Sequence, residues 1–509
     1  MNHSVAKFPL KVASVDVGSN AIRFLAAEFQ NERSYTEILS DRCAVRLGHN
    51  VFLSGCLSDE TISSAVSALK NYCGQLQDMG ITLYRAVATS AVRESDNGEE
   101  FIQRVLDETG MRLETISGFE EARLIHIAVK HRIDLRDAQW MLVDLGGGSV
   151  EVSLVDRNGI LWSESHAMGS VRLLEELTVS GQQPGRFNRL LTEYISTLRV
   201  PSLIKNKNPS GFIATGGNIE SLAKLGGTAD KKGVIHLKVQ DLRLLMRKLM
   251  STPYHERIKQ FDLKADRADV ILPAGLVFER IADLMGGDEI LVPQVGLKEG
   301  ILLDLVDGLQ EHETLWEKQT LESAVTLGRK YLFDEQHALQ VARIALSLFD
   351  QLRRVHQLNE KDRQILLAAS ILHDIGGFIS YKKHHKHSLY IISQSELPAF
   401  TPSEMKMIAN VARYHRKGEP QSRHTAFSEL DSQQQERVSR MAAILRMADA
   451  MDREHLQKID NVRINTNGKE ILFHIQGSGD LLLERWALQG KSQYFTKKFD
   501  VQLKFEIER

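Results

Sequence analysis

The sequence has few cysteines, no long apolar run and almost no net charge. Its cysteines, Cys43, Cys56 and Cys73, form no CxxC pair, which argues against a disulfide scaffold or a thiolate zinc site and for a reducing compartment. No apolar run approaches a membrane span, and the N-terminus lacks the apolar core of a signal peptide, so a cytoplasmic protein is expected. The net charge of −2 excludes a global basic field that would recruit nucleic acid, so any site for a polyanion must be local.

What the chain does have is length and an ordinary globular composition. With 509 residues it is too long for one hydrophobic core, and three or four domains are expected. A hydrophobic content of 42% and a charged content of 26% are typical of a soluble globular protein.

A glycine-rich stretch near residue 145 carries a chemical signal. An apolar run ends at Asp144, three glycines and Ser149 follow, and a second apolar run begins around Glu151. This order predicts a strand, a tight turn and a second strand. The N–H groups of such a turn can cradle a phosphate oxygen, and two carboxylates beside phosphate oxygens suit Mg²⁺. Alone, the stretch would fit equally well a glycine-rich hairpin with a solvated aspartate.

The same order of residues occurs a second time, nearer the N-terminus. An apolar strand ends in Asp16, Gly18, Ser19 and Asn20 follow, and another strand signal comes next. The spacing of the two copies is too long for a solenoid repeat. It fits a duplicated α/β domain, in which two hairpins face each other across a cleft and hold a phosphate chain from both sides.

Two further segments place polar side chains where a phosphate could bind. A strand signal is followed by Thr89, Ser90 and Arg93, and α/β sheets place ligands at the carboxyl ends of their strands. Arg93 could bind a phosphate with its planar fork, or it could be a surface residue near a helix start. The acids of the segment 117–124 are better explained, on local evidence, as first-turn acids of a capped helix. Glu121 could instead point into the cleft and orient or deprotonate an attacking water.

Together these motifs resemble the exopolyphosphatase and guanosine pentaphosphate phosphatase family, which belongs to the actin-like ATPase superfamily. The motifs that carry the resemblance, in the family's order, are Asp16-x-Gly-Ser-Asn20, Ala88-Thr-Ser-Ala-x-Arg93, Ser117-Gly-x-Glu-Glu-Ala-Arg-Leu124 and Asp144-x-Gly-Gly-Gly-Ser149-x-Glu151. The segments 166–173, 214–218 and 295–301 extend it, so that it covers residues from about 10 to about 305. Ala21 stands where the family usually has a serine, and little effect is expected.

The resemblance implies a fold and a set of site residues. It implies two ribonuclease-H-like (actin-like) α/β domains that flank a cleft, residues 1–132 and 133–308. Glu121 would activate water with Arg93 as a catalytic, phosphate-binding cation, and Asp144 and Glu151 would bind Mg²⁺ or Mn²⁺. The implied phosphate cradle comprises Asp16, Gly18, Ser19, Asn20, Thr89, Ser90, Gly146, Gly147, Gly148, Ser149, Thr215, Gly216 and Gly217. The last three could equally meet a nucleoside.

Beyond about residue 310 the pattern changes to long helical periodicity. An apolar helix ends in His373 and Asp374, with His337 upstream and Asp449 on a later helix. This set resembles the HD metal-dependent phosphohydrolase superfamily, which implies that these four residues bind a divalent metal whose identity stays open. The alternative is a helical domain of this ancestry that binds no metal.

The last two expected domains are a helical HD-like domain, 309–458, and a small β-rich domain, 459–509, whose apolar residues alternate in part. His387 and His415 could hold a second metal ion in the helical domain. A homodimer is implied by the resemblance, because the helical domains of relatives pack across a two-fold axis.

The sequence therefore predicts an exopolyphosphatase, which hydrolyses the terminal phosphate of inorganic polyphosphate with Mg²⁺. The near alternative is the same reaction on guanosine pentaphosphate, which yields ppGpp, and both activities can coexist. More distant alternatives are an HD-domain nucleotide phosphohydrolase and an actin-like sensor that binds ATP without turnover. No membrane partner and no specific nucleic acid are expected.

Overall fold

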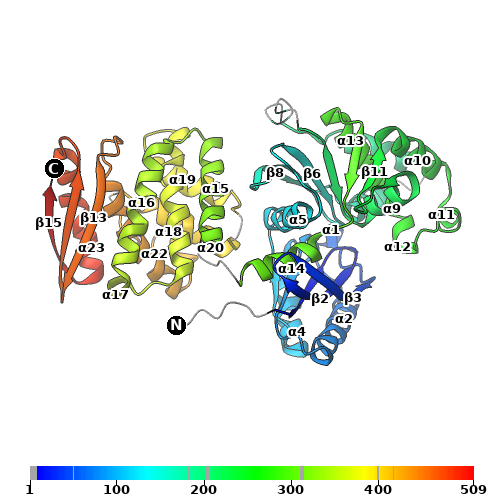
Figure 1. The fold of residues 1–509 in the computed structure, drawn as a ribbon, viewed down its shortest axis with the longest axis horizontal. Helices are drawn as coiled ribbons and strands as arrows, with labels where there is room; N and C mark the ends of the chain where they lie inside the picture. Colours follow the sequence, from blue (N-terminus) through cyan, green and yellow to red (C-terminus); the bar gives the residue numbers. More distant parts are fainter. Residues whose placement is uncertain are drawn as a thin grey trace. The chain divides into compact units, whose positions relative to one another are not determined.

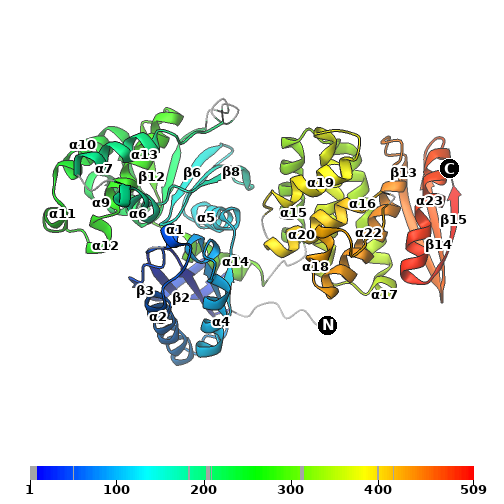
Figure 2. The same ribbon diagram turned by 180° about the vertical axis from the view of Figure 1, so that it is seen from behind.

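The computed structural model describes residues 8–49, 51–180, 184–201, 204, 207, 209–309, 314–397, 400–416 and 418–508. The chain divides into two compact units, Met1–His312 and Glu313–Arg509, and Figures 1 and 2 show them from opposite sides. Within the described ranges, no helix combines the length and apolar character needed to cross a membrane.

The first unit contains two sheets that share one topology. In the first sheet the order is β3-β2-β1-β4-β5, with the first three strands antiparallel and the last two parallel to β1. Its strands are β1 (Leu10–Val17), β2 (Ile22–Asn31), β3 (Ser34–Cys43), β4 (Tyr84–Ala88) and β5 (Leu113–Thr115). Its helices are α1 (Val51–Ser54), α2 (Asp59–Asp78), α3 (Ser90–Arg93), α4 (Gly98–Thr109) and α5 (Gly118–Arg132).

The second sheet repeats this order and extends it. Its order is β10-β11-β12-β9-β6-β7-β8, so β8-β7-β6-β9-β12 corresponds to the whole first sheet. The strands are β6 (Trp140–Leu145), β7 (Val150–Val155), β8 (Ile160–His166), β9 (Phe212–Thr215), β10 (Thr228–Ala229), β11 (Ile235–Lys238) and β12 (Glu289–Val292). The helices are α6 (Ser170–Ser180), α7 (Pro184–Ile195), α9 (Gly217–Gly226), α10 (Val239–Ser251), α11 (Tyr254–Gln260), α12 (Ala265–Ala268) and α13 (Ile271–Met285). The expected pair of α/β domains is confirmed.

Strand β6 shows how the fold aims a side chain at the site. Met141 and Val143 point into the core beside α9 and α13, whereas Leu142 points into the core that contains Leu124 of α5. Because side chains alternate along a strand, Asp144 lies on the same face as Leu142. The strand thus directs Asp144 toward the side of the sheet that α5 covers.

Helix α14 (Leu297–Asp307) follows the second sheet in sequence but packs on the first. Its Leu302 and Val306 share a core cluster with Val12 of β1. It also crosses α5 closely, since a Cβ built on Gly300 would lie 2.0 Å from the backbone oxygen of Leu124. Glycine is therefore required where these two helices cross.

The second unit is helical and ends in a small sheet. Its helices are α15 (Thr314–Lys330), α16 (Glu335–Gln351), α17 (Arg353–His356), α18 (Glu360–Leu372), the 3₁₀ turn η1 (Ile375–Phe378), α19 (His384–Ser393), α20 (Pro402–Arg413), α21 (Thr425–Ser428) and α22 (Ser432–Ala450). The sheet contains β13 (Ile459–Asn467), β14 (Glu470–Gly477) and β15 (Gln502–Glu508), with α23 (Leu482–Phe499) between the last two. Phe473 and Phe495 belong to the same core as Phe349 and Leu445, so sheet and helices form one core.

Candidate functional site

Two hairpin turns carry the predicted phosphate motifs, and the same hydrogen bond closes both. The Gly18 N–H donates to the carbonyl of Ala21, and the Gly146 N–H donates to the carbonyl of Ser149, each at 3.1 Å. The hairpins are β1–β2 in the first sheet and β6–β7 in the second. The sequence repeat is therefore a structural repeat down to the turn.

The aspartates that precede these turns face residues of opposite charge across their hairpins: one faces a cation and the other an acid. Asp16 pairs across its hairpin with Arg23, whose Nη1 lies 2.7 Å from Asp16 Oδ2. Asp144 pairs at the equivalent position with Glu151. Like charges opposite each other in a sheet repel, so the second hairpin holds two buried acids where the first holds an ion pair.

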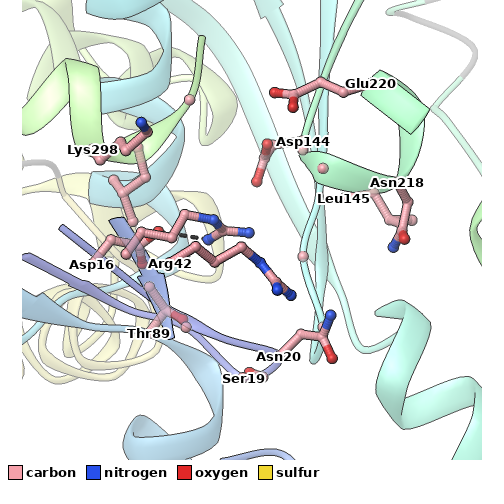
Figure 3. Close-up of a pocket in the computed structure, with 18 of the residues that line it drawn as sticks. Asp16, Ser19, Asn20, Arg42, Thr89, Asp144, Leu145, Asn218, Glu220 and Lys298 are labelled. Atoms are coloured by element: carbon pink, nitrogen blue, oxygen red, sulfur yellow. Dashed lines mark hydrogen bonds and ion pairs between the residues drawn. The ribbon is translucent and has the colours of Figure 1, made fainter. Parts of the chain in front are cut away.

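The two turns contact each other at their tips. A Cβ built on Gly147 would lie 2.9 Å from Ser19 Cβ and 3.2 Å from the Asn20 nitrogen. The hydroxyls of Ser19 and Ser90 lie 2.9 Å apart on the first domain's side of this contact. Only glycine at position 147 permits so close an approach, and a cavity opens beside it (Figure 3).

Helix α5 brings a glutamate to the same place. Ser117 caps the helix by accepting from the Glu120 N–H. Glu120 is ion-paired with Arg123 and Arg85, at 2.7 and 3.2 Å. Glu121 has no such partner, and its buried Oε2 makes no hydrogen bond. The local explanation as a first-turn acid therefore accounts for Glu120, whereas Glu121 is free for another role.

Glu121, Asp144 and Glu151 form one buried cluster, in which one carboxylate oxygen from each lies within 4.8 Å of the others. The Oε2 atoms of both glutamates are buried and unpartnered. Hydroxyl groups donate to one oxygen each of Asp144 and Glu151. Thr215 Oγ1 donates to Asp144 Oδ1 at 2.5 Å. Ser149 Oγ and Ser165 Oγ donate to Glu151 Oε1 at 2.6 and 2.9 Å.

The pKa values of all three acids are raised above their usual range. Burial raises the pKa of Asp144 to about 6 and, with the charge of Asp144, that of Glu151 to about 7. Burial and the charge of Glu151 raise the pKa of Glu121 well above its usual range, although Arg93 opposes this. Uncompensated carboxylates that converge in this way suit a hard divalent cation.

The cavity has a volume of about 490 Å³ and is lined by most of the predicted residues. These are Asp16, Gly18, Ser19, Asn20, Thr89, Ser90, Glu121, Asp144, Gly146, Gly147, Ser149, Gly216 and Gly217. Four predicted residues do not line it: Arg93, Gly148, Glu151 and Thr215. Arg93 Nη1 instead donates to the carbonyl of Ile116 at 2.8 Å, so its effect on the site is through its charge on Glu121.

Five cationic side chains line the same cavity and were missed in the sequence: Arg23, Arg42, Lys264, Arg267 and Lys298. Arg23 and Arg42 stand on β2 and β3, Lys264 and Arg267 at α12, and Lys298 on α14. They come from four separate segments, and none of these segments is a basic run. Lys298 alone lies within a segment that carries the family resemblance, 295–301, so it is the one cation whose place in the site could have been predicted from the sequence.

Arg267 is the one of these five cations whose pKa is lowered. Its Nη1 donates to Asn218 Oδ1 at 3.0 Å. Burial, together with the charges of Arg23 and Arg42, lowers its pKa to about 10. Arg23 and Arg42 have carboxylate partners, Asp16 and Asp266, whereas the lowered pKa of Arg267 shows that its charge is only partly compensated. Such a cation favours binding of an anion.

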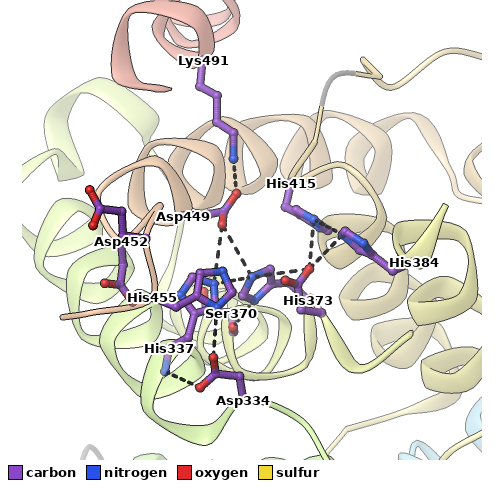
Figure 4. Close-up of polar contacts among 12 residues, drawn as sticks. Asp334, His337, Ser370, His373, His384, His415, Asp449, Asp452, His455 and Lys491 are labelled. Carbon is purple, nitrogen blue, oxygen red and sulfur yellow. Dashed lines mark hydrogen bonds and ion pairs between the residues drawn. The ribbon is translucent and has the colours of Figure 1, made fainter. Parts of the chain in front are cut away.

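The four residues expected to form an HD-type metal site come together in the second unit (Figure 4). The Nε2 atoms of His337 and His373 lie 3.3 Å apart, and Asp449 Oδ1 lies 3.7 Å from each. Asp374 Oδ1 lies 3.8 Å from His373 Nε2.

Of the two histidines expected to hold a second metal, only His415 joins this cluster. His384 Nε2 and His415 Nε2 lie 3.0 and 3.2 Å from Asp374 Oδ1. His387 was the wrong choice, because it lies one turn further along α19 and belongs to no group of described residues that could hold a metal. Adjacent histidines in a short basic run could not be told apart before the helix start was known.

Known proteins resemble both units. Residues 28–309 match the Ppx/GppA phosphatase family, and residues 321–492 match Ppx/GppA phosphatase, domain III. A guanosine-5'-triphosphate,3'-diphosphate pyrophosphatase of Aliivibrio fischeri is 26% identical over 440 residues, which cover 85% of this chain and 86% of that protein. A protein of the same name from Vibrio vulnificus is 27% identical over 411 residues, which cover 80% of each chain.

Solved structures resemble more than half of the chain. An exopolyphosphatase from Cytophaga hutchinsonii matches with a TM-score of 0.55 and 27% identity, over 59% of this chain and 100% of that one. An exopolyphosphatase-like protein, 24% identical with a TM-score of 0.50 over 58% of this chain and 97% of its own, shows the fold. Since the first family match extends over more than half of the sequence, the chain belongs to the Ppx/GppA phosphatase family.

Proposed function

We propose that this phosphatase removes the terminal phosphate of inorganic polyphosphate by hydrolysis of a phosphoanhydride bond. The observation that carries the proposal is the lining of the cavity. Buried carboxylates stand there beside five cationic side chains, and none of the described lining residues is aromatic. A row of phosphates needs positive charge and N–H donors along its length, whereas pockets for ring systems are usually lined by apolar and aromatic groups.

In this proposal Glu121 positions the attacking water and accepts its proton. Its free Oε2 is buried beside Asp144 and Glu151. The water oxygen forms a bond to the terminal phosphorus, and its proton passes to Glu121. The bond between that phosphorus and the bridging oxygen breaks, and the shortened chain leaves with the bridging oxygen.

The carboxylate cluster fits the Mg²⁺ or Mn²⁺ ion that such chemistry requires. Two unpartnered buried oxygens and three raised pKa values show that the cluster lacks a cation of its own. Asp144 and Glu151 would hold the ion. When bound, it would neutralise charge that develops on the phosphate oxygens.

The remaining lining residues would hold the phosphates beyond the one that reacts. The N–H groups of the two glycine turns can donate hydrogen bonds to phosphate oxygens. Burial and the charges of Arg23 and Arg42 lower the pKa of Arg267, and an anion beside Arg267 would offset the repulsion. Several contacts of this kind along a chain would support successive cleavages without release.

Guanosine pentaphosphate is the second candidate substrate. The specific observation in its favour is that curated relatives that match over 80% or more of this chain are named for that activity. Both substrates present a terminal phosphoanhydride, so the same Glu121 chemistry applies to either. They differ only in what the far end of the phosphate chain is attached to.

Measurement of kcat/KM on both substrates, for the wild type, Glu121→Gln and His373→Ala, tests the proposal. We expect polyphosphate to be the better substrate and Glu121→Gln to lose hydrolysis of both, with binding retained. Activity that survives Glu121→Gln but not His373→Ala would assign the chemistry to the histidine cluster instead. Binding of ATP without release of phosphate would favour the actin-like sensor.

We also propose that the chain forms a homodimer, as the resemblance implies. Light scattering of the full-length protein tests this, and a mass near 57.4 kDa, that of one chain, would contradict it.

A further inference from the structure

The side-chain amide of Asn20 has a buried donor without a partner at the cavity. Asn20 stands at the tip of the β1–β2 hairpin, lines the cavity (Figure 3) and is only 7% exposed. Its Nδ2 atom is buried and makes no hydrogen bond to any described residue. A buried N–H group without an acceptor costs free energy. We therefore expect this amide to donate to a group that enters the cavity.

Arg46 determines which atom of the Asn20 amide is left for the cavity. The Nε atom of Arg46 donates to Asn20 Oδ1 at 3.0 Å. A guanidinium group has only donors, so the atom that it contacts must be the amide oxygen. Because Oδ1 and Nδ2 lie on opposite sides of the planar amide, this contact turns Nδ2 away from Arg46. Arg46 therefore prevents the amide from presenting an acceptor, which would repel a phosphate oxygen.

The rest of the Arg46 guanidinium is held by the second α/β domain. Its Nη1 and Nη2 atoms donate to Asp269 Oδ2 and Oδ1 at 2.8 and 3.2 Å, and Nη2 also donates to the carbonyl of Asp266 at 3.0 Å. A pair of parallel bonds to one carboxylate fixes the plane of the guanidinium group. Burial opposes the charge of Arg46, but Asp269 outweighs it and raises the pKa of Arg46. Arg46 is thus fully engaged, and it is not among the residues that line the cavity.

The backbone around Arg46 is fixed against the same hairpin. Arg46 lies between β3 and α1, in a segment where the Gly48 N–H donates to the carbonyl of Ser19 at 2.7 Å. A Cβ built on Gly48 would lie 3.1 Å from that carbonyl oxygen and 2.8 Å from the ring of Phe52. The backbone near Arg46 therefore belongs to the first domain, whereas its guanidinium reaches Asp269, directly after α12 of the second.

We propose that Arg46 is a positioning residue, which aims the Asn20 Nδ2 atom at a phosphate oxygen of the substrate and is itself held in place by Asp269. The inference rests on the proposed function, because it takes the cavity to bind a phosphate chain. A hydrogen bond to a charged phosphate oxygen is of the stronger kind. Since Asn20 and Asp269 belong to different α/β domains, Arg46 also makes the aim of this donor depend on how the two domains are packed.

Steady-state kinetics of the full-length protein on tripolyphosphate test the proposal. Arg46→Lys keeps the positive charge, but an ammonium group lacks the planar fork that reaches Asn20 and Asp269 together. We expect KM to rise by about 10–100-fold, the worth of one hydrogen bond to a charged group, and kcat to change little. Asn20→Ala should have the same effect. A merely structural role would instead lower the melting temperature and the active fraction, and leave KM unchanged.

A double variant separates action through Asn20 from an independent effect. Arg46→Lys combined with Asn20→Ala should have the KM of Asn20→Ala alone, because no amide is left to orient. Arg343→Lys is the matched control. The guanidinium of Arg343 also donates through all three nitrogen atoms, to one side-chain and two backbone oxygens of the C-terminal unit, so its replacement should leave KM unchanged.

Two results would overturn the proposal: a wild-type KM in Arg46→Lys, or increases in KM that multiply in the double variant. Circular dichroism establishes that each variant is folded. If Arg46→Lys is not, Asp269→Asn takes its place, for which KM should also rise and an unchanged KM counts against the proposal.

Failure of the proposed function is distinguishable from failure of this inference. A wild-type chain that releases no phosphate contradicts the proposed function. Calorimetric titration of the wild type and Arg46→Lys with tripolyphosphate then decides the inference. Binding that is about 10–100-fold weaker in the variant supports it, and equal or absent binding in both chains overturns it.

Discussion

Glu120 and Glu121 stand side by side at the start of α5 but ionise differently. Burial opposes the charge of Glu120, yet Arg123 and Arg85 outweigh it and lower its pKa. Glu121 has acids around it, so its pKa is raised. The same substitution at the two positions should therefore have different consequences.

Glu121→Gln is expected to lower kcat for phosphate release by about 10²–10⁴-fold, the usual contribution of a general base. The amide keeps the shape of the side chain but cannot accept the proton of water, so the affinity for polyphosphate should change little. Initial rates and equilibrium binding of polyphosphate measure the two effects.

Glu120→Gln is the matched control. It breaks buried ion pairs and should lower the free energy of unfolding while kcat stays close to that of the wild type. If both variants lost kcat equally with unchanged stability, Glu121 would have no special role.

Glu151→Gln is expected to stabilise the metal-free protein at high pH. The pKa of Glu151 is raised by burial to about 7, whereas an unfolded glutamate has a pKa of about 4.3. The folded state therefore favours the protonated acid, and this stability is present below the unfolded pKa and lost as the pH rises through about 7. Glutamine does not ionise, and its oxygen can still accept from Ser149 and Ser165.

The gain at pH 8 should be on the order of 1–3 kcal/mol and should vanish near pH 4. Melting temperatures in EDTA at the two pH values measure it. Glu164 is an exposed glutamate on β8, so Glu164→Gln should leave the melting temperature unchanged at both pH values. An equal gain for Glu151→Gln at both pH values would contradict the role of ionisation.

At the scale of elements, the two hairpins were predictable from the sequence, but the cations that line the cavity beside them were not. The order of strand, Asp-x-Gly and polar turn is local, so the sequence places Asp16 and Asp144 correctly. The pairing of Asp144 with Glu151 follows from a tight turn and the two-residue period of a strand. By contrast, Arg42 and Arg267 meet in the cavity only through the packing of separate domains, and no local pattern marks them.

Helix α23 was missed for a related reason. Residues 459–509 alternate in parts, which predicts the strands of the sheet but hides what joins them. Strands β14 and β15 are parallel, and parallel neighbours require a long crossover connection, usually a helix. The direction of a strand is a property of the whole sheet and cannot be read from its residues.

Gly147→Ala tests the contact between the two hairpin tips. The new Cβ would lie 2.9 Å from Ser19 Cβ, so the tips must move apart and the groups that face each other across the cavity would be misplaced. A displacement of this size is expected to cost about 10²-fold in kcat/KM.

Gly146→Ala is the comparison, because its Cβ would meet only the Ser149 oxygen, at 3.5 Å. That variant should be much more active than Gly147→Ala. Equal losses would show that alanine in the turn blocks the phosphate rather than the approach of the tips.

At the scale of the whole molecule, each hydrophobic core lies within one unit. Among the described residues, the large core of the second unit draws on residues from Leu321 onward, and the other cores end at Val306. All residues of the cavity are in the first unit. A solved exopolyphosphatase is matched over its full length by 59% of this chain, so a fold of this size can stand alone.

A fragment of residues 1–309 is therefore expected to fold and to hydrolyse short polyphosphate with most of the kcat of the full chain. In calorimetry the full-length protein should show two transitions, because two cores unfold separately, and the fragment should reproduce one of them. Mg²⁺ should shift that transition upward, since it binds the folded carboxylates and not the unfolded chain. Glu121→Gln within the fragment should abolish its activity as it does in the full chain. A fragment that folds and binds Mg²⁺ but releases no phosphate would show that the C-terminal unit contributes to the reaction itself. That outcome would contradict the expectation from the cavity, whose lining residues all belong to the first unit.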